Sequence, residues 1–207
     1  VNWADAHADA ILEAWYPGSH GGTALAEVIL GDYNPGGKLT VTFPKTVGQI
    51  PFNFPYKPNS QVDGNSKPGI NGNQSRINGS LYDFGYGLSY TTFEYSVPVL
   101  DKKEYETDDT IVAKVELTNT GSREAVEIVQ MYVRDLVGSV TRPVRELKGF
   151  RRVKVAPGET VVVEFELPIE NLAFYGLDMV KKVEPGDFQM WIAGDSASGS
   201  PVSFIVR

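Results

Sequence analysis

The sequence predicts a mainly β protein, in which an immunoglobulin-like β-sandwich follows an incomplete α/β segment. The first observation is that apolar and polar residues alternate over residues 91–207, as in strands with one buried face. The second is a turn-rich composition, with 21 glycines and 13 prolines among 207 residues. The third is that helix signals are confined to residues 1–56, which are too few to close an α/β domain.

Residues 1–56 read as one strand–helix–strand unit. The apolar run Ala10–Tyr16 predicts a buried strand that ends in a Pro-Gly turn. Thr23–Leu30 predicts a helix, with apolar side chains at i,i+4 spacing and Gly31 as its C-terminal glycine. Leu39–Phe43 predicts a second strand that stops at Pro44. Because one such unit cannot bury both faces of its sheet, we expect these residues to be the end of a larger α/β domain.

The beginning of the chain supports the same expectation. The first residue is Val1 and not methionine, so we expect the chain to be processed or to be a piece of a longer protein. The opening VNWADAHADA lacks the basic and apolar regions of a signal peptide. No apolar stretch reaches the roughly 18 residues that a membrane span requires.

The middle of the chain, residues 57–80, is predicted to be a long loop. Gly, Pro, Asn and Ser make up 15 of the 23 residues in 58–80. A loop of this length is either a surface insertion or a contributor to the rim of a binding site, and both interpretations stay open. Asn73 and Asn78 match the N-glycosylation pattern, which chance explains in so Asn- and Ser-rich a stretch.

Residues 91–207 predict about seven strands in about 115 residues, the size of an immunoglobulin-like sandwich without its cysteine pair. In the clearest strand, Ile111, Ala113, Val115 and Leu117 share one face. Gly149 predicts a kink in a strand near Leu147–Val155. The other predicted strands are Thr92–Val97, Val129–Val133, Val161–Leu167, Phe188–Ile192 and Val202–Val206.

Composition excludes several classes of function. Asp and Glu number 26 against 19 Lys and Arg, and this net charge of −7 argues against a nucleic-acid partner. The chain has no cysteine and only two histidines, so we expect no metal site and no cofactor. One basic cluster is interpreted as a solvated strand face or a dock for a neighbouring domain: Arg142, Arg145, Lys148, Arg151, Arg152 and Lys154.

Ser19 and His20 are the only weak site candidates. They lie between a predicted strand and a predicted helix, where α/β sheets form ligand crevices. Three interpretations remain: a structural turn, a loop that faces a ligand crevice, or a nucleophile with its base. The surrounding glycines match neither dinucleotide nor P-loop spacing, and the carboxylates of residues 1–56 show no sign of a catalytic pair.

The aromatic segment Leu81–Tyr90 completes the pattern. Its rings could form a platform for sugars, but so dense a cluster between two regions is more typical of packing between domains.

The segment LYDFGYGLSYTTFEYS at 81–96 resembles the region that joins the second and third domains of glycoside hydrolase family 3, the β-glucosidase and β-xylosidase family. AWYPGSHGGTALAEVILGDYNPGGKLTVTFP at 14–44 resembles the end of that family's α/β sandwich domain. VTRPVRELKGFRRVKVAPGET at 140–160 and VEPGDFQMWIAGDSA at 183–197 resemble its fibronectin type III-like domain. Asp83 departs from the family, which usually has proline there.

The resemblance implies three parts: residues 1–56 as the C-terminal portion of an α/β sandwich domain, 57–90 as a loop and linker, and 91–207 as a fibronectin type III-like sandwich. Family members are retaining, exo-acting hydrolases of terminal β-D-glucosyl or β-D-xylosyl residues. Their nucleophile lies in an N-terminal barrel and their acid/base upstream of the segment that matches Ala14–Gly22. The resemblance therefore implies no catalytic residue in this chain.

The implied partners are the barrel, the remainder of the α/β domain and a β-linked glycan, and the implied location is secreted or periplasmic. On this basis we expect the isolated chain to be inactive and to serve domain docking. The alternative is a carbohydrate-binding module that uses exposed aromatic side chains such as Tyr132 or Trp191.

Overall fold

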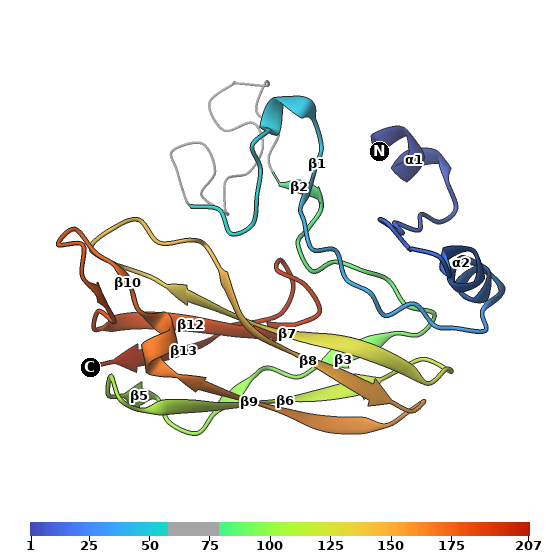
Figure 1. Ribbon diagram of the computed structural model, residues 1–207. Helices are drawn as coiled ribbons and strands as arrows, with labels where there is room; N and C mark the ends of the chain where they lie inside the picture. Colours follow the sequence, from blue (N-terminus) through green and yellow to red (C-terminus); the bar gives the residue numbers. More distant parts are fainter. Residues whose placement is uncertain (58–78) are drawn as a thin grey trace, which may run out of the picture.

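The computed structural model describes residues 1–57 and 79–207, and its largest part is a two-layer β-sandwich (Figure 1). One layer is a five-stranded sheet in the order β5-β13-β12-β7-β8. In the other layer, β6 lies between β9 and the two short strands β3 and β4. The bounds are β3 Phe93–Tyr95, β4 Val99–Leu100, β5 Glu104–Tyr105, β6 Thr110–Asn119, β7 Ala125–Asp135, β8 Glu146–Val155, β9 Thr160–Pro168, β12 Gly186–Ala193 and β13 Val202–Val206.

The core between the layers confirms the period-2 interpretation. Ile111, Ala113, Val115 and Leu117 of β6 are all buried, and their partners on β9 alternate in the same way. The opposite layer contributes Val129, Met131, Val133, Phe188, Met190, Ile192, Phe204 and Val206. Every strand predicted for residues 91–207 is present, so the mainly β fold is confirmed.

The predicted kink at Gly149 is a β-bulge. Met131 pairs with Gly149 and Tyr132 with Leu147, so Lys148 is an extra residue on β8. A Cβ on Gly149 would lie 3.3 Å from the Met131 methyl group and 3.4 Å from the Phe165 ring. Glycine therefore lets the bulged strand approach the core closely.

The N-terminal region contains α1 (Asn2–His7), α2 (Gly21–Leu30), the 3₁₀ turn η1 (Val47–Gln49) and the small β1–β2 pair (Phe43–Pro44 with Ser80–Tyr82). The helix predicted over 23–30 is confirmed as α2. Gly31 closes it in the left-handed conformation, with φ 84°.

Two strand predictions in this region are wrong. Ala10–Tyr16 is irregular and mostly exposed, with Trp15 at a positive φ of 49°, and no strand of residues 1–57 or 79–207 pairs with it. Leu39–Phe43 reduces to the two-residue β1, which pairs antiparallel with β2. Because a strand forms only beside a hydrogen-bonding neighbour, an apolar run without one stays irregular. The strand–helix–strand unit is therefore absent.

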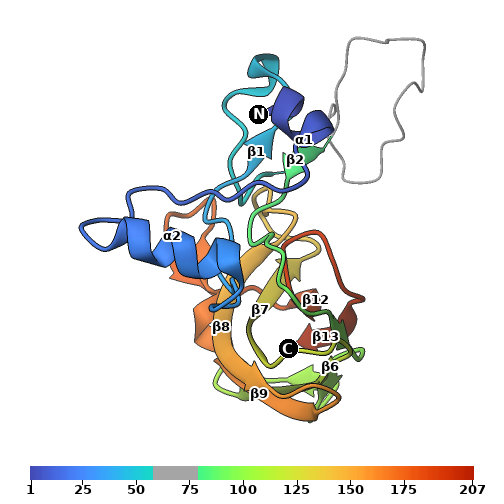
Figure 2. The same ribbon diagram turned by 90° about the vertical axis from the view of Figure 1, so that its right-hand side faces the viewer.

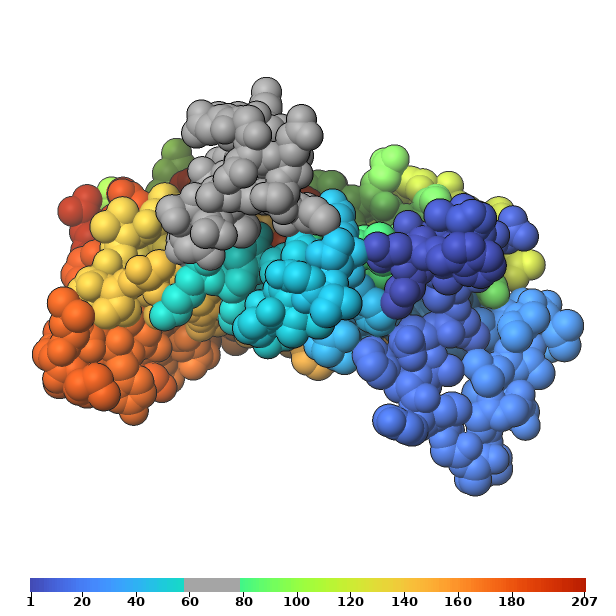
Figure 3. Space-filling model, turned by 90° about the horizontal axis from the view of Figure 1, so that it is seen from above, coloured from blue at the N-terminus to red at the C-terminus, as the bar shows by residue number. Residues whose placement is uncertain are grey.

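The N-terminal region lies over the outer face of the five-stranded sheet, above β7 and β8 (Figures 1 and 2). Seen from above, the part around α2 projects beyond the outline of the sandwich (Figure 3). At the other end, η2 (Ile169–Leu172) leads into the hairpin of β10 (Phe174–Tyr175) and β11 (Lys181–Lys182), which the sequence patterns did not indicate.

Most of the predicted 57–80 loop, with Asn73 and Asn78, lies outside the described residues. Within the described part, no helix is both long and apolar enough to cross a membrane.

Candidate docking interface

Two short segments attach the N-terminal region to the sandwich. Leu39 donates its backbone N–H to the carbonyl of Tyr86 at 2.8 Å, and Gly85 donates to the carbonyl of Leu39 at 2.7 Å. Gly36 passes so close to β7 that an added Cβ would lie 2.7 Å from the Val126 carbonyl oxygen. These contacts join residues 36–39 to residues 85–86, and both segments lie on the outer face of the sheet.

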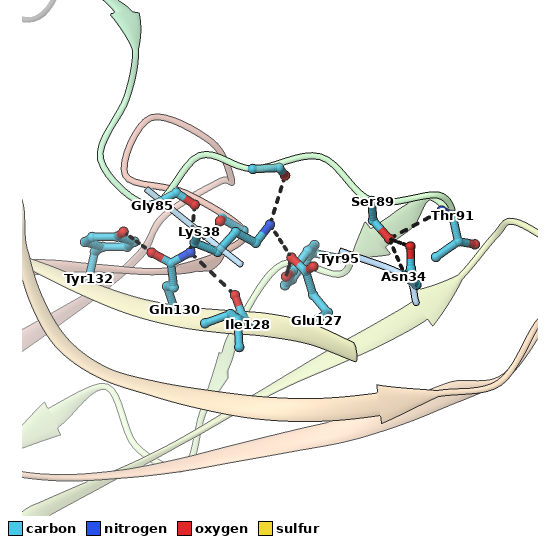
Figure 4. A network of polar contacts seen from close by, with 12 residues as sticks. Asn34, Lys38, Gly85, Ser89, Thr91, Tyr95, Glu127, Ile128, Gln130 and Tyr132 are labelled. Carbon is cyan, nitrogen blue, oxygen red and sulfur yellow. Dashed lines mark hydrogen bonds and ion pairs between the residues drawn. The ribbon is translucent and has the colours of Figure 1, made fainter. Parts of the chain in front are cut away.

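A buried ion pair lies beneath these segments (Figure 4). Lys38 Nζ is 3.0 Å from Glu127 Oε1, and the two side chains are only 13% and 4% exposed. Tyr95 donates its hydroxyl to the same oxygen at 2.8 Å, while Lys38 also donates to the Gly87 carbonyl at 3.2 Å. Burial, followed by the adjacent Glu127 carboxylate, raises the pKa of Tyr95, so Tyr95 remains a neutral donor.

The buried amide of Gln130 forms the second half of the interface. Its Nε2 donates to the carbonyls of Gly85 at 3.1 Å and Gly194 at 2.5 Å, and its Oε1 accepts the Tyr132 hydroxyl at 2.5 Å. Both amide protons and the amide oxygen are therefore satisfied by groups of three different segments. An added Cβ on Gly85 would collide with Gln130 Oε1, so this contact requires glycine.

A third contact ties α2 to the start of the sandwich. Asn34 donates to the Ser89 hydroxyl at 2.9 Å and accepts from the Tyr90 N–H at 2.7 Å. Tyr90 in turn donates its hydroxyl to the Val28 carbonyl at 2.7 Å, in the last turn of α2. The end of the helix is thus held by side chains from the aromatic segment.

The aromatic segment packs between the two regions, as one of its interpretations predicted. Phe84 stacks on Phe54 with centroids 4.6 Å apart, and Phe54 meets the edge of Tyr132 at 5.7 Å. Tyr82 and Tyr86 stack on each other at 5.5 Å. These rings therefore pack against one another.

Tyr132 and Trp191, the rings proposed for glycan binding, are buried. Tyr132 is 0% exposed and Trp191 6% exposed, because the N-terminal region and the Arg145 guanidinium, 4.1 Å from the Trp191 ring, cover them. The interpretation of these two as exposed binding aromatics is wrong. The alternation of apolar and polar residues could not show that these two rings are buried, since the outer face of a sheet is exposed unless another segment covers it.

Ser19 and His20 lie at the start of α2, away from this interface. Both are exposed, and neither side chain forms a hydrogen bond with residues 1–57 or 79–207. The neighbouring turn is tight: Gly18 has φ 71°, and a Cβ on Gly21 would lie 2.7 Å from Pro17 Cγ. The structure thus contains the predicted turn, while a role of Ser19 and His20 at a ligand crevice stays a prediction.

Three cations of the basic cluster are paired with carboxylates. Lys148 pairs with Glu146 at 2.7 Å, Lys154 with Glu124 at 2.7 Å, and Arg142 with Glu146 at 2.7 Å. Burial is the largest influence on Arg145, and it lowers the pKa of that guanidinium. No group of three His, Asp or Glu side chains in the described part of the chain could hold a metal ion.

Comparison with known proteins assigns the chain to a family. Residues 1–90 match the glycosyl hydrolase family 3 C-terminal domain, and residues 127–196 match a fibronectin type III-like domain. The chain belongs to glycoside hydrolase family 3. It is 45% identical to the periplasmic β-glucosidase of Salmonella typhimurium over 97% of its own length, and 42% identical to a β-xylosidase of Formosa agariphila over 95%.

Solved family structures share the fold of the chain. A β-glucosidase from Erythrobacter marinus superposes with a TM-score of 0.87 at 35% identity over 99% of this chain, and one from Listeria innocua with 0.86 at 32% over 96%. The chain spans only 26% of the length of the Salmonella and Formosa relatives, and it matches their C-terminal portion.

Lys38, Glu127 and Gln130, whose side chains hold this interface together, were not among the candidates expected from the sequence. The available signal was that Glu127 and Gln130 interrupt an otherwise apolar strand, where a buried polar side chain requires a partner.

Proposed function

We propose that this chain is the C-terminal portion of an exo-acting, retaining β-glycosidase, in which it serves a structural role. The parent would remove terminal β-D-glucosyl or β-D-xylosyl residues by means of two carboxylates and a glycosyl-enzyme intermediate. Family membership supports this proposal, as do the names of the relatives, which include both a β-glucosidase and a β-xylosidase. The name of the Salmonella relative supports a location outside the cytoplasm.

The Lys38–Glu127 pair is the observation that carries the structural role. A buried ion pair adds little net stability, because the cost of removing both charges from water offsets their attraction. It does penalise every arrangement in which one charge is buried alone, so it fixes the register of two surfaces. We propose that residues 1–56 are the end of an α/β domain, that 57–90 are a linker and that 91–207 are the sandwich domain. The sandwich domain would hold the end of the α/β domain in place.

The exposed apolar side chains of the N-terminal region fit the same proposal. Trp3, Trp15, Tyr16, Ile29 and Leu30 of this region are all exposed. Exposed apolar groups in this number are typical of a surface that another part of a protein covers. The remainder of the α/β domain and the barrel of the parent are the proposed cover.

Two experiments test this function. The 207-residue chain is assayed on an aryl β-glucoside and an aryl β-xyloside, and we expect no turnover above the uncatalysed rate. Turnover by the purified chain would contradict the structural role.

In the intact parent, Lys38→Met should shorten the half-life of activity on heating and leave KM and the initial kcat unchanged. A fall in kcat with no change in thermal half-life would show that the interface serves the chemistry directly.

A further inference from the structure

A pocket of about 430 Å³ lies beside the docking interface. Its floor is the outer face of β7 and β8, where Ile128 pairs with Arg152 and Gln130 pairs with Phe150. Directly opposed residues of an antiparallel pair share a face, so all four side chains point to the same side of the sheet. The walls are Tyr33, residues 36–40, Phe84 and Gly85. The volume lies within the range of small-molecule sites.

The pocket is lined mainly by apolar groups. Val126, Ile128, Leu147 and Leu39 contribute aliphatic surface, and Phe150 adds a ring that is 60% exposed. Tyr33 and Phe84 also line the pocket with aromatic rings. Such surfaces favour a ligand with a flat apolar body.

The polar groups of the pocket divide into two sets. Lys38 and Gln130 already bind groups of the docking interface, which occupy two of the three ammonium protons and both amide protons. The Arg152 guanidinium and the Tyr33 hydroxyl form no ion pair or hydrogen bond within residues 1–57 and 79–207. A guanidinium binds a carboxylate through two parallel hydrogen bonds. The pocket therefore offers the Arg152 guanidinium and the hydroxyls of Tyr33 and Thr40 beside an apolar floor.

We propose that this pocket binds a small aromatic carboxylate, with the ring on the apolar floor near Phe150 and the carboxylate on Arg152. A sugar is a poor fit, because its many hydroxyl groups would lie against a mainly apolar lining with few polar partners. The site is independent of the glycosidase proposal, since none of its residues is assigned to catalysis.

The test is titration of the isotope-labelled 207-residue chain with benzoate, followed by amide NMR shifts. Saturable shifts should be confined to residues 33–40, 84–85, 126–130 and 147–152. Arg152→Gln should weaken the affinity about 10-fold or more, as expected for the loss of a charged hydrogen bond. Benzyl alcohol should bind as weakly to the unchanged chain as benzoate does to the variant.

The matched control is Lys154→Gln, which removes a cation from the same strand face but outside the pocket. Its ion pair with Glu124 is exposed, so the control should keep its affinity for benzoate. Equal weakening in both variants would overturn the proposal, because it would show attraction to the general charge of the face. The absence of any saturable shift up to about 10 mM benzoate would also overturn it. Such a result would mean that the binding free energy is smaller than roughly 3 kcal/mol. Stronger binding of glucose would overturn it as well.

Discussion

Removing one charge of the Lys38–Glu127 pair should destabilise the docked arrangement strongly. At 3.0 Å and an effective dielectric constant of about 20, two unit charges attract by about 5–6 kcal/mol. The cost of burying both charges offsets most of this attraction in the intact pair. Lys38→Met removes the attraction but leaves the Glu127 carboxylate buried, with Tyr95 as its remaining side-chain donor. We expect a loss of about 3 kcal/mol, at the lower end of the range for broken buried pairs.

The assay is thermal and urea unfolding of the 207-residue chain, followed by tryptophan fluorescence. A loss of about 3 kcal/mol corresponds to a fall in Tm of roughly 6–12 °C for a protein of this size. Glu127→Gln should cost a similar amount. The double variant should cost much less than the sum, with a coupling energy of about 2 kcal/mol, because no lone charge remains buried.

Lys154→Met is the control, since its partner Glu124 is exposed and such pairs contribute at most about 1 kcal/mol. If Lys38→Met costs no more than this control, or if the two single losses simply add, the interface is not held by a desolvated ion pair.

Two further predictions follow from the same surface. Gly85→Ala should destabilise the chain by about 2 kcal/mol or more, because it combines a positive φ with a collision against Gln130. The control is Gly18→Ala, which has a similar φ but open space around it and should cost only about 1 kcal/mol. Equal losses would show that the Gln130 contact is unimportant. Tyr82 donates to Asp5 at 2.6 Å, and this hydrogen bond raises its pKa from 10.0 to about 12. Because the folded state holds this proton more tightly, the stabilisation of α1 is complete below pH 10 and is lost as pH rises through about 12. In Asp5→Asn, ultraviolet titration should show this tyrosine ionising nearer pH 10; an unchanged titration would exclude Asp5 as the cause.

The sandwich was predictable because its information is local. Strands such as β6 and β9 alternate apolar and polar residues with a period of two, and the turns that follow β6 and β8 carry Gly121 and Gly158. The bulge at Gly149 could be predicted for the same reason, since a glycine within a strand marks a close approach. The family resemblance came from motifs spread over nearly the whole chain.

The N-terminal region was less predictable. Ala10–Tyr16 has the composition of a buried strand, but a strand requires a neighbour, and composition does not say whether one is present. The helix α2 was predictable because its backbone hydrogen bonds are internal to the segment.

The mainly β class, most strand positions and the family follow from the sequence. Which face of the sandwich is covered depends on contacts that form only in the folded chain. The tertiary structure turned Tyr132 and Trp191 from candidate binding rings into buried ones, and it brought Lys38 to Glu127 across 89 positions of chain. The physical reason is that burial and ion pairing depend on segments that are distant in sequence, whereas periodicity reports only how one segment would present its own two faces.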